Sequence, residues 1–204
     1  MEQAEPSEMA RIQLAVHKRK ARHAAAPLIS GTQRVGISTA EGDMLVEVFP
    51  ELAPITASNF MAYVEGKYFD DQSIFRIVTP HNEPARPGPR IAVVQAGWLP
   101  TSEFDRQPFP NIPLETTTAT GLRHKRGALS MARHAAGQSG PSFSFMMRDE
   151  PELDEGGARH PDGKGFSVFG RLLNGWGTLE RIYARAEEQP WLKRRITIFS
   201  ATRA

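Results

Sequence analysis

Residues 34–49 read RVGISTAEGDMLVEVF. Apolar and polar side chains alternate on both sides of a turn at Glu41-Gly42-Asp43. A period of two is typical of half-buried strands, so this segment predicts a β-hairpin.

Short runs of the same kind recur along the chain, at residues 73–78, 91–96, 127–132, 142–147, 166–173 and 195–201. Apolar residues at helical spacing predict two helices, one from Pro54 to Gly66 and one containing Leu179, Ile182, Tyr183 and Ala186. Most successive strands lack the crossover helix that a parallel sheet requires. We therefore expect a mainly β fold, a closed eight-stranded antiparallel β-barrel capped by two α-helices.

Composition excludes several classes of protein. The longest apolar run, residues 60–64, is five residues, whereas a membrane-spanning helix needs about 20. The absence of cysteine excludes disulfides, thiolate zinc sites and a cysteine nucleophile. No apolar segment follows the basic N-terminal region as a secretory signal requires, so we expect a cytoplasmic protein. We also expect a monomer that does not bind membranes.

We interpret residues 1–32 as an N-terminal extension, helical or partly flexible, and residues 33–204 as the globular domain. Residues 17–23 read HKRKARH. A solvated basic helix or frayed arm is favoured over a polyanion-binding tail, because the formal net charge of the chain is only +2. We expect no nucleic-acid partner, although salt-sensitive binding lost on deletion of 1–32 would indicate one.

Familiar catalytic motifs are missing from the sequence. It contains no phosphate-binding P-loop and no Gly-x-Ser-x-Gly motif, and its six histidines lack metal-site spacing on a helix. The acidic run at residues 149–155 lacks the ligand pattern of an EF-hand and is expected to be a solvated loop. We therefore expect no metal and no cofactor. Arg76 is unusual because its neighbours on both sides are apolar, although such an arginine often simply faces solvent.

Six motifs, in order, carry a family resemblance. They are APITASNF at 53–60, IFRIV at 74–78, VQAG at 94–97, GALSMA at 127–132, SFSFM at 142–146 and VFG at 168–170. Across residues 34–201 the chain resembles the cyclophilin family of peptidyl-prolyl cis-trans isomerases. The resemblance implies the family's barrel and its activity on proline-containing peptides or proteins. Residues 153–166 are similar to a bacterial branch with a longer loop.

The resemblance also implies a site. Arg76 matches the catalytic arginine, Gln95 a glutamine that binds a substrate carbonyl, and Ala132 a backbone-contact position. The walls of the proline pocket are expected from Phe145, Leu153, Phe166 and Val93.

The sequence departs from the family's pattern at several positions. Ala92-Val93 stands where the family has Phe-Met, Glu152 where it has tryptophan and Phe166 where it has histidine. Residues 79–90 are also longer than the family's tight turn.

Two functions follow from these residues. An isomerase would use a fixed donor such as Arg76 to stabilise the twisted amide of an Xaa-Pro bond, a step that needs no metal or nucleophile. The alternative is a cyclophilin-like peptide-binding module with little or no turnover, which the departures at Ala92, Glu152 and Phe166 motivate.

Overall fold

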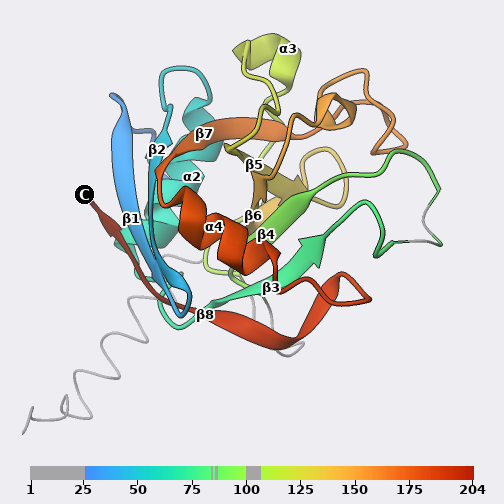
Figure 1. Cartoon of the computed structure of the whole chain (residues 1–204). Coiled ribbons are helices and arrows are strands. Elements are labelled where there is room, and N and C mark those ends of the chain that lie inside the picture. The colour runs from blue at the N-terminus through green and yellow to red at the C-terminus, as the bar shows by residue number, and fades with distance from the viewer. Residues whose placement is uncertain (1–25, 84, 86, 100–106) are drawn as a thin grey trace, which may run out of the picture.

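The computed structural model describes residues 26–83, 85, 87–99 and 107–204. Eight antiparallel strands close into a barrel in the order β1-β2-β7-β5-β6-β4-β3-β8 (Figure 1). The strands are β1 Gln33–Thr39, β2 Gly42–Val48, β3 Ser73–Val78, β4 Val93–Gly97, β5 Ala128–Arg133, β6 Ser139–Met146, β7 Ser167–Asn174 and β8 Trp191–Arg203. The predicted barrel is confirmed, and the last strand begins four residues earlier than the alternation indicated.

Two helices pack on the barrel, α4 (Trp176–Tyr183) in front of it and α2 (Pro54–Glu65) behind it in Figure 1. Helix α2 has no capping side chain of its own at Ala53. The carboxylate of Glu115 instead accepts hydrogen bonds from the backbone N–H groups of Ile55 (3.0 Å) and Thr56 (2.7 Å). Glu115, about 60 positions away in the sequence, therefore bonds two N–H groups that have no partner within the helix. Its negative charge also interacts favourably with the positive end of the helix dipole. A short helix α3 (Thr117–Thr120) and a 3₁₀ turn (Pro151–Leu153) complete the described helical structure.

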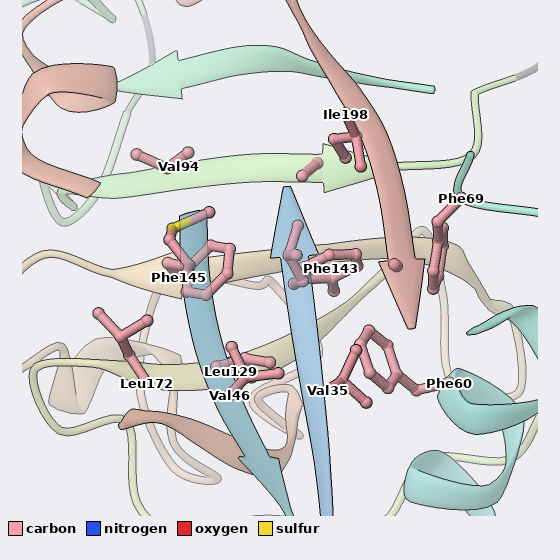
Figure 2. Close-up of a cluster of buried hydrophobic side chains, with 14 of the residues drawn as sticks. Val35, Val46, Phe60, Phe69, Val94, Leu129, Phe143, Phe145, Leu172 and Ile198 are labelled. Atoms are coloured by element: carbon pink, nitrogen blue, oxygen red, sulfur yellow. The ribbon is translucent and has the colours of Figure 1, made fainter. Parts of the chain in front are cut away.

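The main hydrophobic core fills the barrel (Figure 2). Phe60 extends from α2 into this core, with its ring centroid 5.1 Å from those of Phe143 and Phe169 and 5.4 Å from that of Phe69. All four rings are almost completely buried. Helix α2 is therefore fixed to the barrel by aromatic packing.

A second, smaller apolar cluster uses the other face of several of the same strands. Its members are Val78, Ile91, Val93, Ala128, Met146, Leu153 and Val168. On β4, Val94 and Ala96 belong to the main core, whereas Val93 belongs to this outer cluster. Because successive strand side chains point to opposite faces, the barrel wall has apolar side chains on both sides here. We call the second set the outer cluster.

Part of the predicted N-terminal extension is attached to the barrel. The backbone N–H of Ile29 donates to Ser58 Oγ on α2 at 3.0 Å, and the N–H of Gly31 donates to Glu51 at 2.7 Å. The predicted helix and the basic run at residues 17–23 lie outside the described residues. Among the helices described, none combines the length and the apolar character needed to cross a membrane.

We expect Phe60→Ala to lower the free energy of unfolding by about 3–5 kcal/mol, because it leaves a cavity among three packed rings. Phe199→Ala removes a ring that is 55% exposed and should cost about 0.5 kcal/mol. Urea unfolding of both variants checks this, and similar losses would contradict the assigned core.

Candidate active site

A groove of about 720 Å³ lies on the outside of the barrel, over β3, β4, β5 and β6. Six of the seven side chains singled out from the sequence line it: Arg76, Gln95, Ala132, Leu153, Phe166 and Val93. These residues come from three strands and one long loop. The structure therefore brings together residues that are as many as 90 positions apart.

The position of Arg76 depends on an irregularity in β3. The register of this strand shifts between Ile74 and Arg76 against both of its neighbours, β4 and β8. Ile74 and Ile77 lie in the barrel core, whereas the two residues between them, Phe75 and Arg76, both line the groove. An interruption of this kind is a β-bulge, which places two consecutive side chains on one face of a sheet. The bulge explains how an arginine among apolar neighbours reaches the groove.

The guanidinium of Arg76 contacts Gln95, Glu83 and Trp191. Its Nη1 donates to Gln95 Oε1 at 3.1 Å, and its Nη2 donates to Glu83 Oε1 at 2.5 Å. Its Cζ lies 5.7 Å from the centre of the Trp191 ring, within cation–π range. The Arg76 side chain is 19% exposed. Arg76 is therefore a charged donor held at the groove surface, in contact with two side chains from other elements and one aromatic ring.

Phe145 does not line the groove, and the predicted placement was wrong. Its side chain points into the barrel beside Val94 and Leu129, its cross-strand partners (Figure 2). The adjacent strand positions, Ser144 and Met146, line the groove instead. Three closely spaced apolar residues on β6 gave the sequence no marker of which face was inward, and a shift of one position exchanges the two faces.

The apolar part of the groove is built on the outer cluster. Val93, Leu153 and Phe166 lie there together with Ile91 and Met146. These five side chains come from β4, β6 and the loop segments that flank them, and they form a pocket wall next to Arg76.

Two of the positions that differ from the family's pattern, Ala92 and Glu152, contribute no side chain to the groove. Ala92 is buried beside the groove: its backbone N–H donates to Glu150 Oε1 at 2.7 Å, and its carbonyl accepts from the N–H of Met147. Glu152, at the position of the family's tryptophan, accepts a hydrogen bond from the backbone N–H of Ala158 at 2.9 Å. Neither side chain is among those that line the groove.

A buried polar chain lies beneath one wall of the groove. His124 Nδ1 is 2.7 Å from Asp154 Oδ1, and His124 Nε2 is 2.8 Å from the Oγ of Ser130, a residue that lines the groove. The interpretation of the acidic run as a solvated loop was wrong for Asp154 and Glu150, both of which are buried. Two of their hydrogen-bond partners, His124 and the backbone amide of Ala92, are 30 and 58 positions away, too distant in sequence for the motif search to have connected them.

Burial lowers the pKa of His124, although hydrogen bonding to Asp154 acts in the opposite direction. Burial alone would raise the pKa of Asp154, but hydrogen bonds from His124 outweigh burial and hold it below its ordinary value. His124 is therefore neutral and Asp154 charged at neutral pH.

A buried arginine, Arg133, anchors the loop that carries Phe166. Arg133 donates to both carboxylate oxygens of Asp162, at 2.8 and 2.7 Å, and to the carbonyl of Gly165 at 2.7 Å. Its Cζ also lies 5.1 Å from the Phe166 ring centre. Such a bidentate pair is geometrically specific, and here it holds the segment that carries Phe166 against β5. Sequence reasoning did not identify Arg133, Glu83 or Trp191.

We expect the free energy of unfolding to decrease as pH falls below 6.5, the ordinary pKa of histidine. The folded protein resists protonation of His124, so the unfolded chain binds more protons in this range and acid favours unfolding. The measurement is urea unfolding at several pH values between 7.5 and 5. In His124→Gln the free energy of unfolding should depend less on pH than in wild type. His81→Gln, which changes an exposed histidine, should retain the full dependence. An unchanged slope in His124→Gln would contradict the assignment.

Comparison with known proteins identifies the family. The model of the cyclophilin-type peptidyl-prolyl cis-trans isomerases matches residues 34–203. A peptidyl-prolyl cis-trans isomerase of Acinetobacter baylyi is 28% identical, with 72% of this chain and 70% of the relative covered. An isomerase-like 3 protein of Gibberella zeae is 31% identical, with 74% and 83% covered.

Solved structures show the same fold. A Cryptosporidium parvum cyclophilin-type isomerase matches with a TM-score of 0.65 at 19% identity, over 85% of this chain and 98% of that one. Its structure in the presence of the dipeptide Ala-Pro gives a TM-score of 0.64, with 84% and 99% covered. The chain belongs to the family of cyclophilin-type peptidyl-prolyl cis-trans isomerases.

Proposed function

We propose that this protein accelerates cis–trans rotation about Xaa-Pro bonds in proline-containing peptides and proteins, with Arg76 as the catalytic residue. The observation that carries the proposal is the position of the Arg76 guanidinium, held beside an apolar pocket that is walled by Val93, Leu153 and Phe166. Family membership supports the same activity.

The chemistry follows from the electronic structure of the amide. In the planar ground states the lone pair of the prolyl nitrogen is delocalised into the carbonyl, which produces a barrier of about 18–20 kcal/mol. At the twisted transition state this delocalisation is lost and the nitrogen becomes pyramidal and basic. A donor that bonds this nitrogen stabilises the transition state more than either planar state, as catalysis requires. An arginine suits the role because its guanidinium stays protonated and carries five donors in a fixed plane.

Each remaining groove residue has a role in this scheme. The apolar walls hold the proline ring while the residue that precedes it rotates. The Oε1 of Gln95 accepts from Arg76, and its amide NH₂ group has the donors to bind a substrate carbonyl. The backbone at Ala132 lies along the groove, where an extended peptide would meet it.

The second candidate is a peptide-binding module with little turnover. The observation that favours it is the Glu83 carboxylate, which accepts a hydrogen bond from Arg76 and thereby occupies one of its donors. Both candidates predict that proline-bearing peptides bind in the groove, but only an isomerase changes the exchange rate.

We expect the protein to accelerate cis–trans exchange in a short Ala-Pro peptide, measured directly by exchange NMR. Arg76→Ala should reduce kcat/KM by about a hundredfold or more, the effect of removing one transition-state donor. Arg185→Ala, which removes a half-exposed arginine paired with Glu41, is the matched control and should retain wild-type activity. A wild-type protein that leaves the spontaneous rate unchanged for several residues before proline would reject the isomerase and leave the binding module.

A further inference from the structure

The 79–90 loop, which is longer than the family's tight turn, brings a carboxylate to Arg76. Glu83 uses both of its oxygens: Oε1 accepts from Arg76 Nη2 and Oε2 accepts from Arg159 Nη2, each at 2.5 Å. The side chains of Glu83 and Arg159 are 8% and 4% exposed. This is a buried bridge between two arginines, and one of the two is the proposed catalytic residue.

Hydrogen bonds to neighbouring segments hold both Asn82 and Glu83 in place. The preceding residue, Asn82, is buried, and its side chain accepts from the N–H of Thr79 (2.8 Å) and donates to the carbonyl of Ile77 (2.8 Å). Arg90 donates to the carbonyl oxygen of Glu83. The carboxylate is therefore held by an anchored segment of chain rather than by a free surface loop.

Arg159 ties the other end of the bridge to a second loop. Its Nη1 donates to the carbonyl of Pro89 at 3.0 Å, and its backbone N–H donates to the carbonyl of Glu152. The 79–90 loop and the segment that carries Leu153 are thus joined through Arg159 and Glu83.

Hydrogen bonds to Gln95 and Glu83 orient the guanidinium of Arg76. Gln95 contacts Nη1 of Arg76, and Glu83 contacts Nη2. Two acceptors on two nitrogens define the plane of a guanidinium, whereas a single acceptor leaves it free to swing about that contact. A donor that is already oriented needs no reorganisation when the amide twists.

The carboxyl group of Glu83 is ionised, as an acceptor that orients Arg76 requires. Burial alone would raise the pKa of Glu83, but the hydrogen bonds and positive charges of Arg159 and Arg76 outweigh it and hold the pKa below its ordinary value. Glu83 is therefore a carboxylate throughout the neutral range. Its bond to Arg76 is of the charge-assisted type, which is stronger than a bond between neutral groups.

We propose that Glu83 is a positioning residue, whose carboxylate, anchored by Arg159, fixes the Arg76 guanidinium in the orientation that donates into the groove. The inference rests on the proposed isomerase function, and it adds a residue from the extended loop to the machinery.

The first test compares Glu83→Gln with wild type in peptide exchange. We expect kcat to fall by about tenfold, the scale of a moderate loss of alignment, while KM for the Ala-Pro peptide changes less than twofold. Arg159→Met, which removes the anchor but leaves Glu83 in place, should produce a smaller fall of the same kind. Glu41→Gln, which breaks a surface pair with Arg185, is the matched control and should leave both constants unchanged.

The second test observes Arg76 itself and does not depend on activity. In wild type the Arg76 Nη signals in ¹⁵N–¹H NMR should be resolved, because rotation of the guanidinium is slow. In Glu83→Gln the Arg76 Nη signals should merge. Thermal unfolding of this variant checks that it is still folded. Resolved signals and full activity in Glu83→Gln would overturn the proposal. A rise in kcat would also overturn it, since Glu83 would then be withdrawing the donor from substrate.

The two tests keep the two proposals separate. If wild type does not catalyse exchange, the isomerase function fails, and the NMR signals still decide whether Glu83 orients Arg76. If wild type is active and Glu83→Gln is equally active, the isomerase function stands and the role of Glu83 fails.

Discussion

The candidate site depends on the bulge in β3. In a regular strand Phe75 and Arg76 would face opposite sides of the barrel wall, and one of them would enter the core. The register shift between Ile74 and Arg76 places both on the outer face. Trp191, opposite Arg76 on β8, then stacks on Phe75 with ring centroids 5.7 Å apart. The charged donor, its aromatic neighbour and the apolar pocket therefore share one surface.

The two apolar clusters have complementary roles. The core inside the barrel fixes the relative positions of the strands, and Phe60 secures α2 to them. The outer cluster uses opposite faces of several of those strands and provides the wall of the groove. Two of the wall residues, Val93 and Met146, lie on paired strands of the barrel, so this part of the wall is fixed by the same sheet that encloses the core.

The sequence predicted the features that depend on local pattern. Alternating runs and the spacing of apolar residues were sufficient for the eight strands and for α2 and α4, whereas the six predicted side chains that line the groove were named from the family resemblance. Phe145 was misplaced because the apolar residues along β6 do not themselves specify which face points inward. The Glu83–Arg159 and His124–Asp154 pairs were missed for a different reason: their partners are 76 and 30 positions apart in the sequence. Loop length signalled that residues 79–90 were unusual, but no local pattern specifies which partner a loop carboxylate meets.

The most direct test of the account is a crystal structure of the protein bound to a short peptide that contains Ala-Pro. The account predicts that the proline ring packs against Val93, Leu153 and Phe166. It also predicts that an Arg76 nitrogen lies about 3 Å from the prolyl nitrogen or from the carbonyl oxygen of the Xaa-Pro bond, and that the bulge in β3 is unchanged. A peptide seated elsewhere, or an Arg76 guanidinium turned away from the bound proline, would contradict it.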